Sequence, residues 1–146
     1  MRDLVSHIDP KEMISPDVYT ADNTPVAVDL QGRGACMICI RVGAGGITFD
    51  DTNKIEFVLT KSDDGVTYTP VVQADVDCAT VTGGGIVKAF TEAHAAPALY
   101  KIGVKCDVRY LKLLADFSGT HGTGTHITAF AITGRPDVGP VTDCSL

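Results

Sequence analysis

The sequence predicts an all-β protein, an antiparallel, jelly-roll-like β-sandwich of about eight strands with an extended N-terminal arm. Three features of the 146-residue chain support this prediction. Short apolar stretches alternate with polar positions, turn signals recur roughly every 8–15 residues, and no long amphipathic helix interrupts the pattern. A parallel sheet would need crossover helices between its strands, so a parallel βαβ fold is not expected.

The first 24 residues show little periodicity. Prolines at positions 10 and 16 interrupt them, and Pro25 precedes the first clear strand signals. We therefore expect residues 1–24 to form an extended arm that either hangs free or lies on a neighbouring molecule. The sandwich is expected over residues 25–136, followed by a polar C-terminal tail over residues 137–146.

Strand signals begin after this arm. Residues 26–30 alternate apolar and polar positions, and residues 36–42 form a nearly continuous apolar run, which is typical of a central strand. A glycine-rich break at residues 43–46 ends that run.

A hairpin is predicted in the middle of the chain. Residues 54–61 read KIEFVLTK, with apolar side chains on one face at a period of two. The Asp64-Gly65 pair that follows tolerates the positive φ of a tight turn, so residues 66–72 are expected as the returning strand.

The second half of the chain continues the strand pattern. A glycine triplet at residues 83–85 predicts a loop tip, and the alanine-rich residues 89–98 predict a helical turn that ends at Pro97. The remaining strands, separated by a Gly/Thr/His loop at 118–124, are expected over residues 99–104, 108–115 and 125–133.

The charge balance bears on the class of partner. Twelve basic and eighteen acidic residues give a net charge of −6, with no run of Lys or Arg. Nucleic-acid binding is not expected, because phosphate neutralisation requires a basic face. No apolar stretch approaches the ~20 residues of a membrane helix, and the start of the sequence lacks a secretory signal, so we expect folding in a reducing cytoplasm without a membrane partner.

Five cysteines include one C-x-x-C pair, at Cys36 and Cys39. A redox pair would open a helix, and a zinc half-site would need a second pair or two histidines. Neither context is present, because the residues around Cys39 continue as a strand. We interpret both cysteines as small buried hydrophobes.

The sequence contains no recognisable catalytic motif. His121, His126 and Asp116 could form a metal site only if the fold made them converge, and histidines that face solvent are the simpler interpretation. The Asp-Asp pairs at 50–51 and 63–64 do not have the spacing of a calcium loop and are interpreted as turn residues. A nucleophile elbow is absent as well. We expect no enzyme, no cofactor and no metal.

Two segments resemble the strands of discoidin-like, galactose-binding-type jelly rolls. They are KIEFVLTKSDDGVTYTPV, residues 54–71, and the stretch from Tyr100 to Pro136 with YKIGVKCDVRYLKLLADFSG and HITAFAITGRP. The resemblance implies a sandwich but says little about function, because sandwiches serve many functions. A carbohydrate-binding module is the alternative function it suggests, although the chain has no Trp and four Tyr with which to stack a sugar.

The layout of the whole chain resembles small virion proteins of tailed phages and prophages. The matching segments are MRDLVSHI, AVDLQGRGACMICIRVG, the SDDG hairpin, RYLKLLADFSGT and ITGRPDVGPV. This resemblance implies a non-enzymatic head decoration or cement protein, located on the capsid surface of the virion and assembled in the host cytoplasm. Its partners would be the major capsid protein and further copies of itself, expected as a trimer. A tail or connector component of the same bacteriophage is an open alternative.

The arm and the glycine-rich loops are the expected contact regions. An extended arm can cover a large area of a neighbour as it docks, and glycine loops allow close approach of the backbone. Solvent-facing loops without a partner are the alternative interpretation. The residues expected to contact partners are Arg2, Leu4, Ile8, Met13, Tyr19, Gly45, Gly84 and His121.

Overall fold

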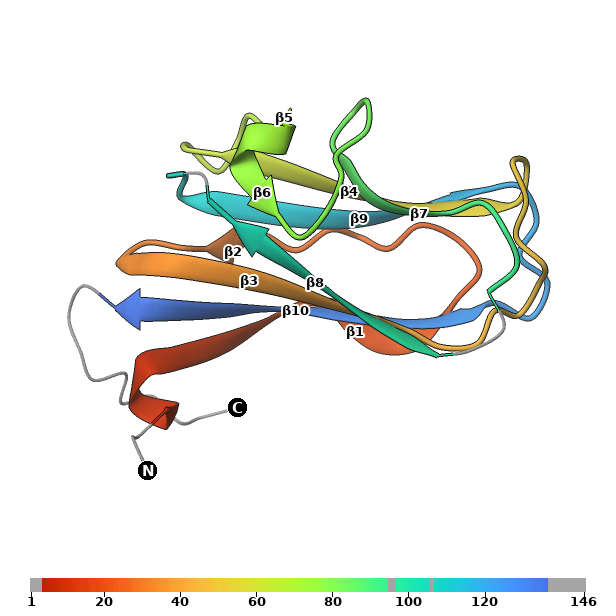
Figure 1. Cartoon of the computed structure of the whole chain (residues 1–146), viewed down its shortest axis with the longest axis horizontal. Helices are drawn as coiled ribbons and strands as arrows, with labels where there is room; N and C mark the ends of the chain where they lie inside the picture. Colours follow the sequence, from red (N-terminus) through yellow and green to blue (C-terminus); the bar gives the residue numbers. More distant parts are fainter. Residues whose placement is uncertain (1–3, 95–96, 106, 137–146) are drawn as a thin grey trace.

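The computed structural model describes residues 4–94, 97–105 and 107–136, which form two antiparallel sheets packed face to face (Figure 1). Sheet A has the order β1-β10-β3-β8-β6, with strands Ile8–Tyr19, Thr125–Pro136, Arg33–Val42, Ala98–Val104 and Val76–Asp77. Sheet B has the order β2-β9-β4-β5, with strands Val28–Asp29, Tyr110–Ser118, Lys54–Ser62 and Thr69–Pro70, and β7, Ile86–Phe90, also pairs with β4. The predicted all-β sandwich is confirmed.

The chain passes repeatedly from one sheet to the other. Strand β2 of sheet B leads to β3 of sheet A and then to β4 of sheet B, and β8, β9 and β10 alternate in the same way. Two short 3₁₀ helices, η1 (Val5–His7) and η2 (Gln73–Asp75), are the only helical segments in the described part of the chain. No helix there is long and apolar enough to cross a membrane.

The core lies between the two sheets. Successive strand residues point to opposite faces, and the predicted period of two in β4 turns Ile55, Phe57 and Leu59 into the core, where each is fully buried. The side chains of Ile38 and Ile40 in β3 meet them from sheet A. Apolar burial of this kind stabilises the sandwich by roughly 25 cal/mol per Å² removed from water.

The N-terminal segment differs from the expected arm. Residues Ile8–Tyr19 form the edge strand of the chain's own sheet A, paired antiparallel with β10 from Ile8↔Gly134 to Tyr19↔Thr125. A register shift between Glu12 and Ile14 marks a bulge that places both Met13 and Ile14 in the core, with exposed fractions of 1% and 2%. The prolines that suggested an arm are tolerated because an edge strand needs to donate hydrogen bonds on one side only.

The predicted hairpin forms, but its returning strand is short. Asp64 accepts backbone N–H bonds from Val66 and Thr67 at 2.8 Å, and these bonds, with one from the Ser62 hydroxyl, lower the pKa of Asp64 to about 2. Gly65 adopts the positive φ of +73° that the prediction required. The strand expected over residues 66–72 reduces to Thr69–Pro70.

The prediction of a helical turn over residues 89–98 is wrong at the residues of this range that the structure describes. Strand β7 runs through Ala89 and Phe90, and β8 begins at Ala98. Phe90 is buried against the core, so the alternation of β7 outweighs the helix propensity of the alanines around it. The expected C-terminal tail, residues 137–146, lies outside the described residues.

Candidate functional site

Three loop segments meet at one end of the sandwich, on the right in Figure 1: residues 43–53, 91–94 and 119–124. The Gly45 N–H donates to the His94 carbonyl at 3.1 Å. A Cβ on Gly46 would lie 1.9 Å from the Gly124 carbonyl oxygen, so this position requires glycine. The close approach expected of the glycine loops therefore occurs within the chain, and Gly45 contacts the chain's own loops.

His121 is buried at this end, with an exposed fraction of 2%. Its Nε2 lies 2.8 Å from the Ser118 carbonyl, which can only accept, so Nε2 carries the proton. The ring packs on Phe117 and Phe49 at centroid distances of 4.6 and 6.3 Å. The prediction that His121 contacts a partner and the interpretation that it faces solvent are both wrong, because the ring fills the end of the core.

The fold does not bring His121, His126 and Asp116 together. His126 is exposed on β10, in sheet A, whereas Asp116 lies on β9, in sheet B, directly across from Glu56. Burial, with the charges of nearby Asp22 and Glu56, raises the pKa of Asp116. No group of three or more His, Cys, Asp or Glu residues that could hold a metal occurs among the described residues.

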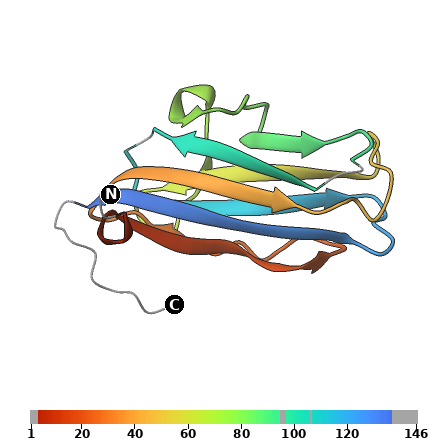
Figure 2. The same cartoon turned by 60° about the horizontal axis from the view of Figure 1, so that its bottom comes forward.

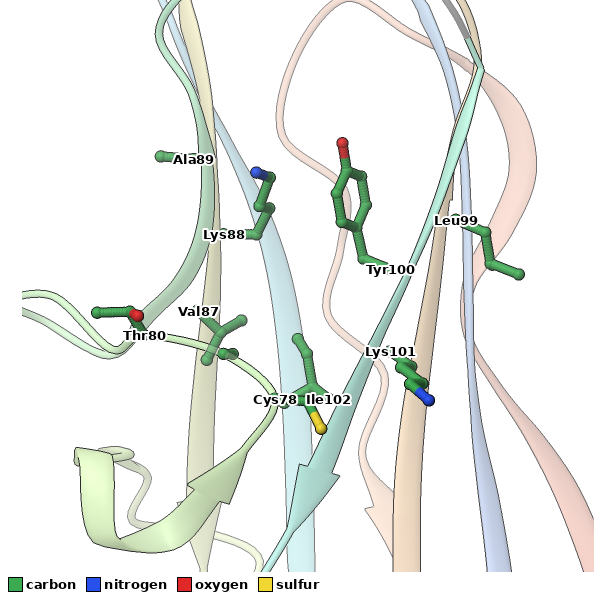
Figure 3. A pocket seen from close by; sticks show the side chains of 10 residues that line it. Cys78, Thr80, Val87, Lys88, Ala89, Leu99, Tyr100, Lys101 and Ile102 are labelled. Atoms are coloured by element: carbon green, nitrogen blue, oxygen red, sulfur yellow. The ribbon is translucent and has the colours of Figure 1, made fainter.

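A cleft of about 510 Å³ opens between β7 and β8 (Figure 3). Lys88 and Tyr100 rise into it from opposite walls, and the Lys88 Nζ lies 4.7 Å from the Tyr100 ring centroid. The same amine lies 5.4 Å from the Phe90 ring. The lining residues include two lysines, Lys88 and Lys101, and no carboxylate or imidazole, which are the most common general bases.

The remaining contact residues predicted near the N-terminus have different environments. Leu4 is 64% exposed at the start of η1, and Ile8 is partly exposed at the start of β1. Met13 is buried in the core, so its expected contact with a partner is wrong. Tyr19 packs against the core and donates its hydroxyl proton to the Ser15 carbonyl at 2.9 Å. Arg2 lies outside the described residues.

Gly84 has the environment expected of an accessible loop. It adopts a φ of +80° just before β7, and a Cβ built on it would meet no atom within 4 Å. Among the eight predicted contact residues, Leu4, Ile8 and Gly84 are therefore open to a partner.

The outer face of sheet A is the feature that sequence reasoning missed. Figure 2 turns β1, β10, β3 and β8 forward, and they lie side by side. Since Ile38, Ile40, Ala129 and Ala131 point into the core, the alternate residues point outward. These outward residues form matched rows, and we call them the outer face of sheet A: Thr128, Arg41 and Leu99; Glu12, Phe130, Cys39 and Lys101; Pro10, Ile132, Met37 and Gly103; Ile8, Gly134 and Ala35.

The middle of this outer face is apolar. Phe130, Ile132 and Met37 are partly exposed, and they do not belong to the core between the sheets. Cys39 is 7% exposed among them, and burial raises the pKa of its thiol although the nearby Lys101 charge opposes the shift. Leu99, on β8, is 62% exposed.

The C-x-x-C pair is split between two faces of β3. Cys36 packs against the core, whereas Cys39 lies in the outer face, because residues three apart on a strand point in opposite directions. The spacing therefore does not bring the two thiols together on one face of the strand, and of the two only Cys39 is buried.

The sequence of β3 and β10 does indicate an apolar outer face. The apolar runs of β3 and β10 carry apolar side chains at consecutive positions rather than alternate ones. The opposite sheet of a two-layer sandwich covers one face of each strand, so such a run predicts a second apolar face that another surface can cover.

Comparisons of the chain with protein-family models, with curated proteins and with solved structures find no match.

Proposed function

We propose that this chain is a non-enzymatic structural protein that functions by associating with other proteins, and that it is a head decoration or cement protein of a tailed bacteriophage. The observation that carries the proposal is the apolar outer face of sheet A. A sheet face of this kind, bordered by charged side chains, is typical of surfaces that bind another protein.

A cement protein must transmit load between neighbouring subunits without unfolding. Two continuous sheets joined by one core supply a rigid body, and strands β1 and β10 tie the N-terminal residues into it over the length of β1. The accessible residues Leu4 and Gly84 lie outside the core and outside the outer face of sheet A, and they are the candidates for contact with the shell of major capsid protein.

The catalytic alternatives have little support among the described residues. The cleft between β7 and β8 has no carboxylate or imidazole among its lining residues, and His121 is held inside the core. An enzyme would need a nucleophile or activated water beside such a base.

Electron microscopy of heads with and without the protein tests the proposal. Heads assembled in its presence should carry additional density on the outer surface, and they should resist heat or dilution longer than heads assembled without it. Identical density and identical survival in the two preparations would refute the cement function. Density confined to the tail or connector would instead support the other virion location.

A carbohydrate-binding module is the second candidate, favoured by Tyr100 in the cleft. Its ring could stack on a sugar, and Lys88 would attract an acidic one. However, Lys88 lies over the Tyr100 ring and would have to move aside. A glycan array would detect this activity, and Tyr100→Ala should abolish any signal that arises in the cleft, whereas Tyr19→Phe should leave it unchanged.

A further inference from the structure

We propose that the outer face of sheet A binds the same face of a second copy of this chain, through a two-fold axis that runs parallel to the strands between β10 and β3. This inference rests on the proposed function, because it names the partner of the surface that carries it.

Charge complementarity supports a second copy as the occupant. The central row reads Glu12, Phe130, Cys39 and Lys101 across β1, β10, β3 and β8. An acid therefore stands at one end of the row and a base at the other, with two apolar side chains between them. Glu12 and Lys101 are both exposed, so they are available to a partner.

The proposed axis exchanges the two halves of each row. With strands about 4.8 Å apart, rotation about an axis between β10 and β3 places β1 over β8 of the other copy and β10 over β3. Each Glu12 then faces the Lys101 of the second copy, which gives two identical ion pairs. Phe130 then lies over Cys39, a large side chain over a small one, and in the next row Ile132 lies over Met37, so the middle of the contact is apolar on both sides.

A two-fold axis across the strands gives a poorer match. Each strand would face itself, so Glu12 would oppose Glu12 and Lys101 would oppose Lys101. Like charges that face each other oppose association, which selects the axis along the strands.

The local charge also favours self-association. Across β1, β10, β3 and β8 the outer face carries one acidic side chain, Glu12, and two basic ones, Arg41 and Lys101, whereas the whole chain has a net charge of −6. Asp77, on the neighbouring edge strand β6, forms an ion pair with Lys105 at 3.0 Å. The contact thus brings together two patches that are less negative than the rest of the molecule, which limits the repulsion between two acidic copies. Arg41 would face Thr128 of the second copy, and not another cation.

The extent of the face predicts a weak dimer. Four strands span about 19 Å, and the nine residues from 126 to 134, which are eight steps of about 3.4 Å, span about 27 Å. This gives about 500 Å² on each copy and about 1,000 Å² in total, near the lower limit for a specific interface. We expect a dissociation constant in the micromolar range. A self-complementary face closes on a two-fold axis, so the contact yields a pair in place of the trimer expected from the sequence.

Sedimentation of the full chain between about 1 µM and 1 mM tests this proposal. The unaltered protein should shift from monomer to dimer across this range. Glu12→Lys and Lys101→Glu should each weaken dimerisation about tenfold to thirtyfold, because each replaces two attractions with two repulsions. The double variant Glu12→Lys/Lys101→Glu should restore it. Lys112→Glu, the same change on the outer face of sheet B, should leave dimerisation unchanged.

Circular dichroism serves as the control for folding. Each variant should give the spectrum of the unaltered protein, because the altered side chains are at the surface. A monomer throughout the concentration range, a trimer, or a double variant no stronger than the single ones would overturn the proposal. Sedimentation measures self-association without capsids, whereas binding to heads measures the proposed function, so the failure of one is distinguishable from the failure of the other.

Discussion

Met13 offers the sharpest test of the N-terminal strand. In the structure its side chain is 1% exposed in the core of its own chain, whereas a detachable arm would bury it only against a neighbour. Met13→Ala removes three heavy atoms, which costs about 2.4 kcal/mol of transfer free energy at ~0.8 kcal/mol per group. The cavity that remains adds to this loss, so the free energy of unfolding should fall by about 3 kcal/mol.

Urea unfolding followed by circular dichroism measures this change. With a slope of about 2 kcal/mol per molar urea, the midpoint should fall by about 1.5 M. Leu4→Ala is the matched control, because it truncates an apolar residue of the same segment that is 64% exposed, and it should change the free energy by less than about 0.5 kcal/mol. Equal midpoints for the two variants would refute the placement of β1 in the core. So would a Met13→Ala effect that disappears on dilution, since that would place the side chain in a neighbouring molecule.

Three further predictions concern two loop residues and the partly buried ion pair between Lys61 and Asp75. Asn23→Ala should lower the free energy of unfolding by about 1–3 kcal/mol in a urea titration, because the Ala115 N–H loses the buried carboxamide oxygen that accepts it at 2.7 Å. Gly46→Ala should greatly lower the melting temperature, since its Cβ would overlap the Gly124 carbonyl, whereas Gly83→Ala, in open space, should not. Burial raises the pKa of Asp75, but the hydrogen bonds from Lys61 and from a backbone N–H outweigh it and hold the pKa below its usual value. The stabilisation that the ionised Asp75 carboxylate provides is therefore present above about pH 4 and is lost as the pH falls through the lowered pKa. Asp75→Asn should flatten this part of a profile of unfolding free energy against pH.

Much of the sandwich could be predicted because its central strands obey simple local rules. The period of two in β4 and the Asp64-Gly65 turn are each determined by residues close together in the chain. Strand β1 could not be predicted in this way. Its pairing partner β10 lies more than 100 residues later, and its bulge at Met13 breaks the alternation on which a sequence-based prediction depends.

The candidate contact residues were predicted less well, for a physical reason. Loop glycines and loop histidines look alike in a sequence whether they face a partner or their own chain. Gly45 and His121 turned inward because three loops that are distant in sequence close over Phe49, and that convergence depends on the whole fold.

The outer faces of the two sheets differ in how much apolar surface they carry. On sheet B, one outward row of β4 and β9 is apolar, Val58 with Leu114, and it lies between a row that holds Glu56 with Asp116 and a row that holds Thr60 with Lys112. On sheet A, the corresponding central positions hold Phe130, Ile132, Met37 and Cys39. Sheet A therefore has two successive apolar rows at the centre of its outer face, where sheet B has one. The proposed contact with a second copy would remove the wider apolar face, that of sheet A, from water.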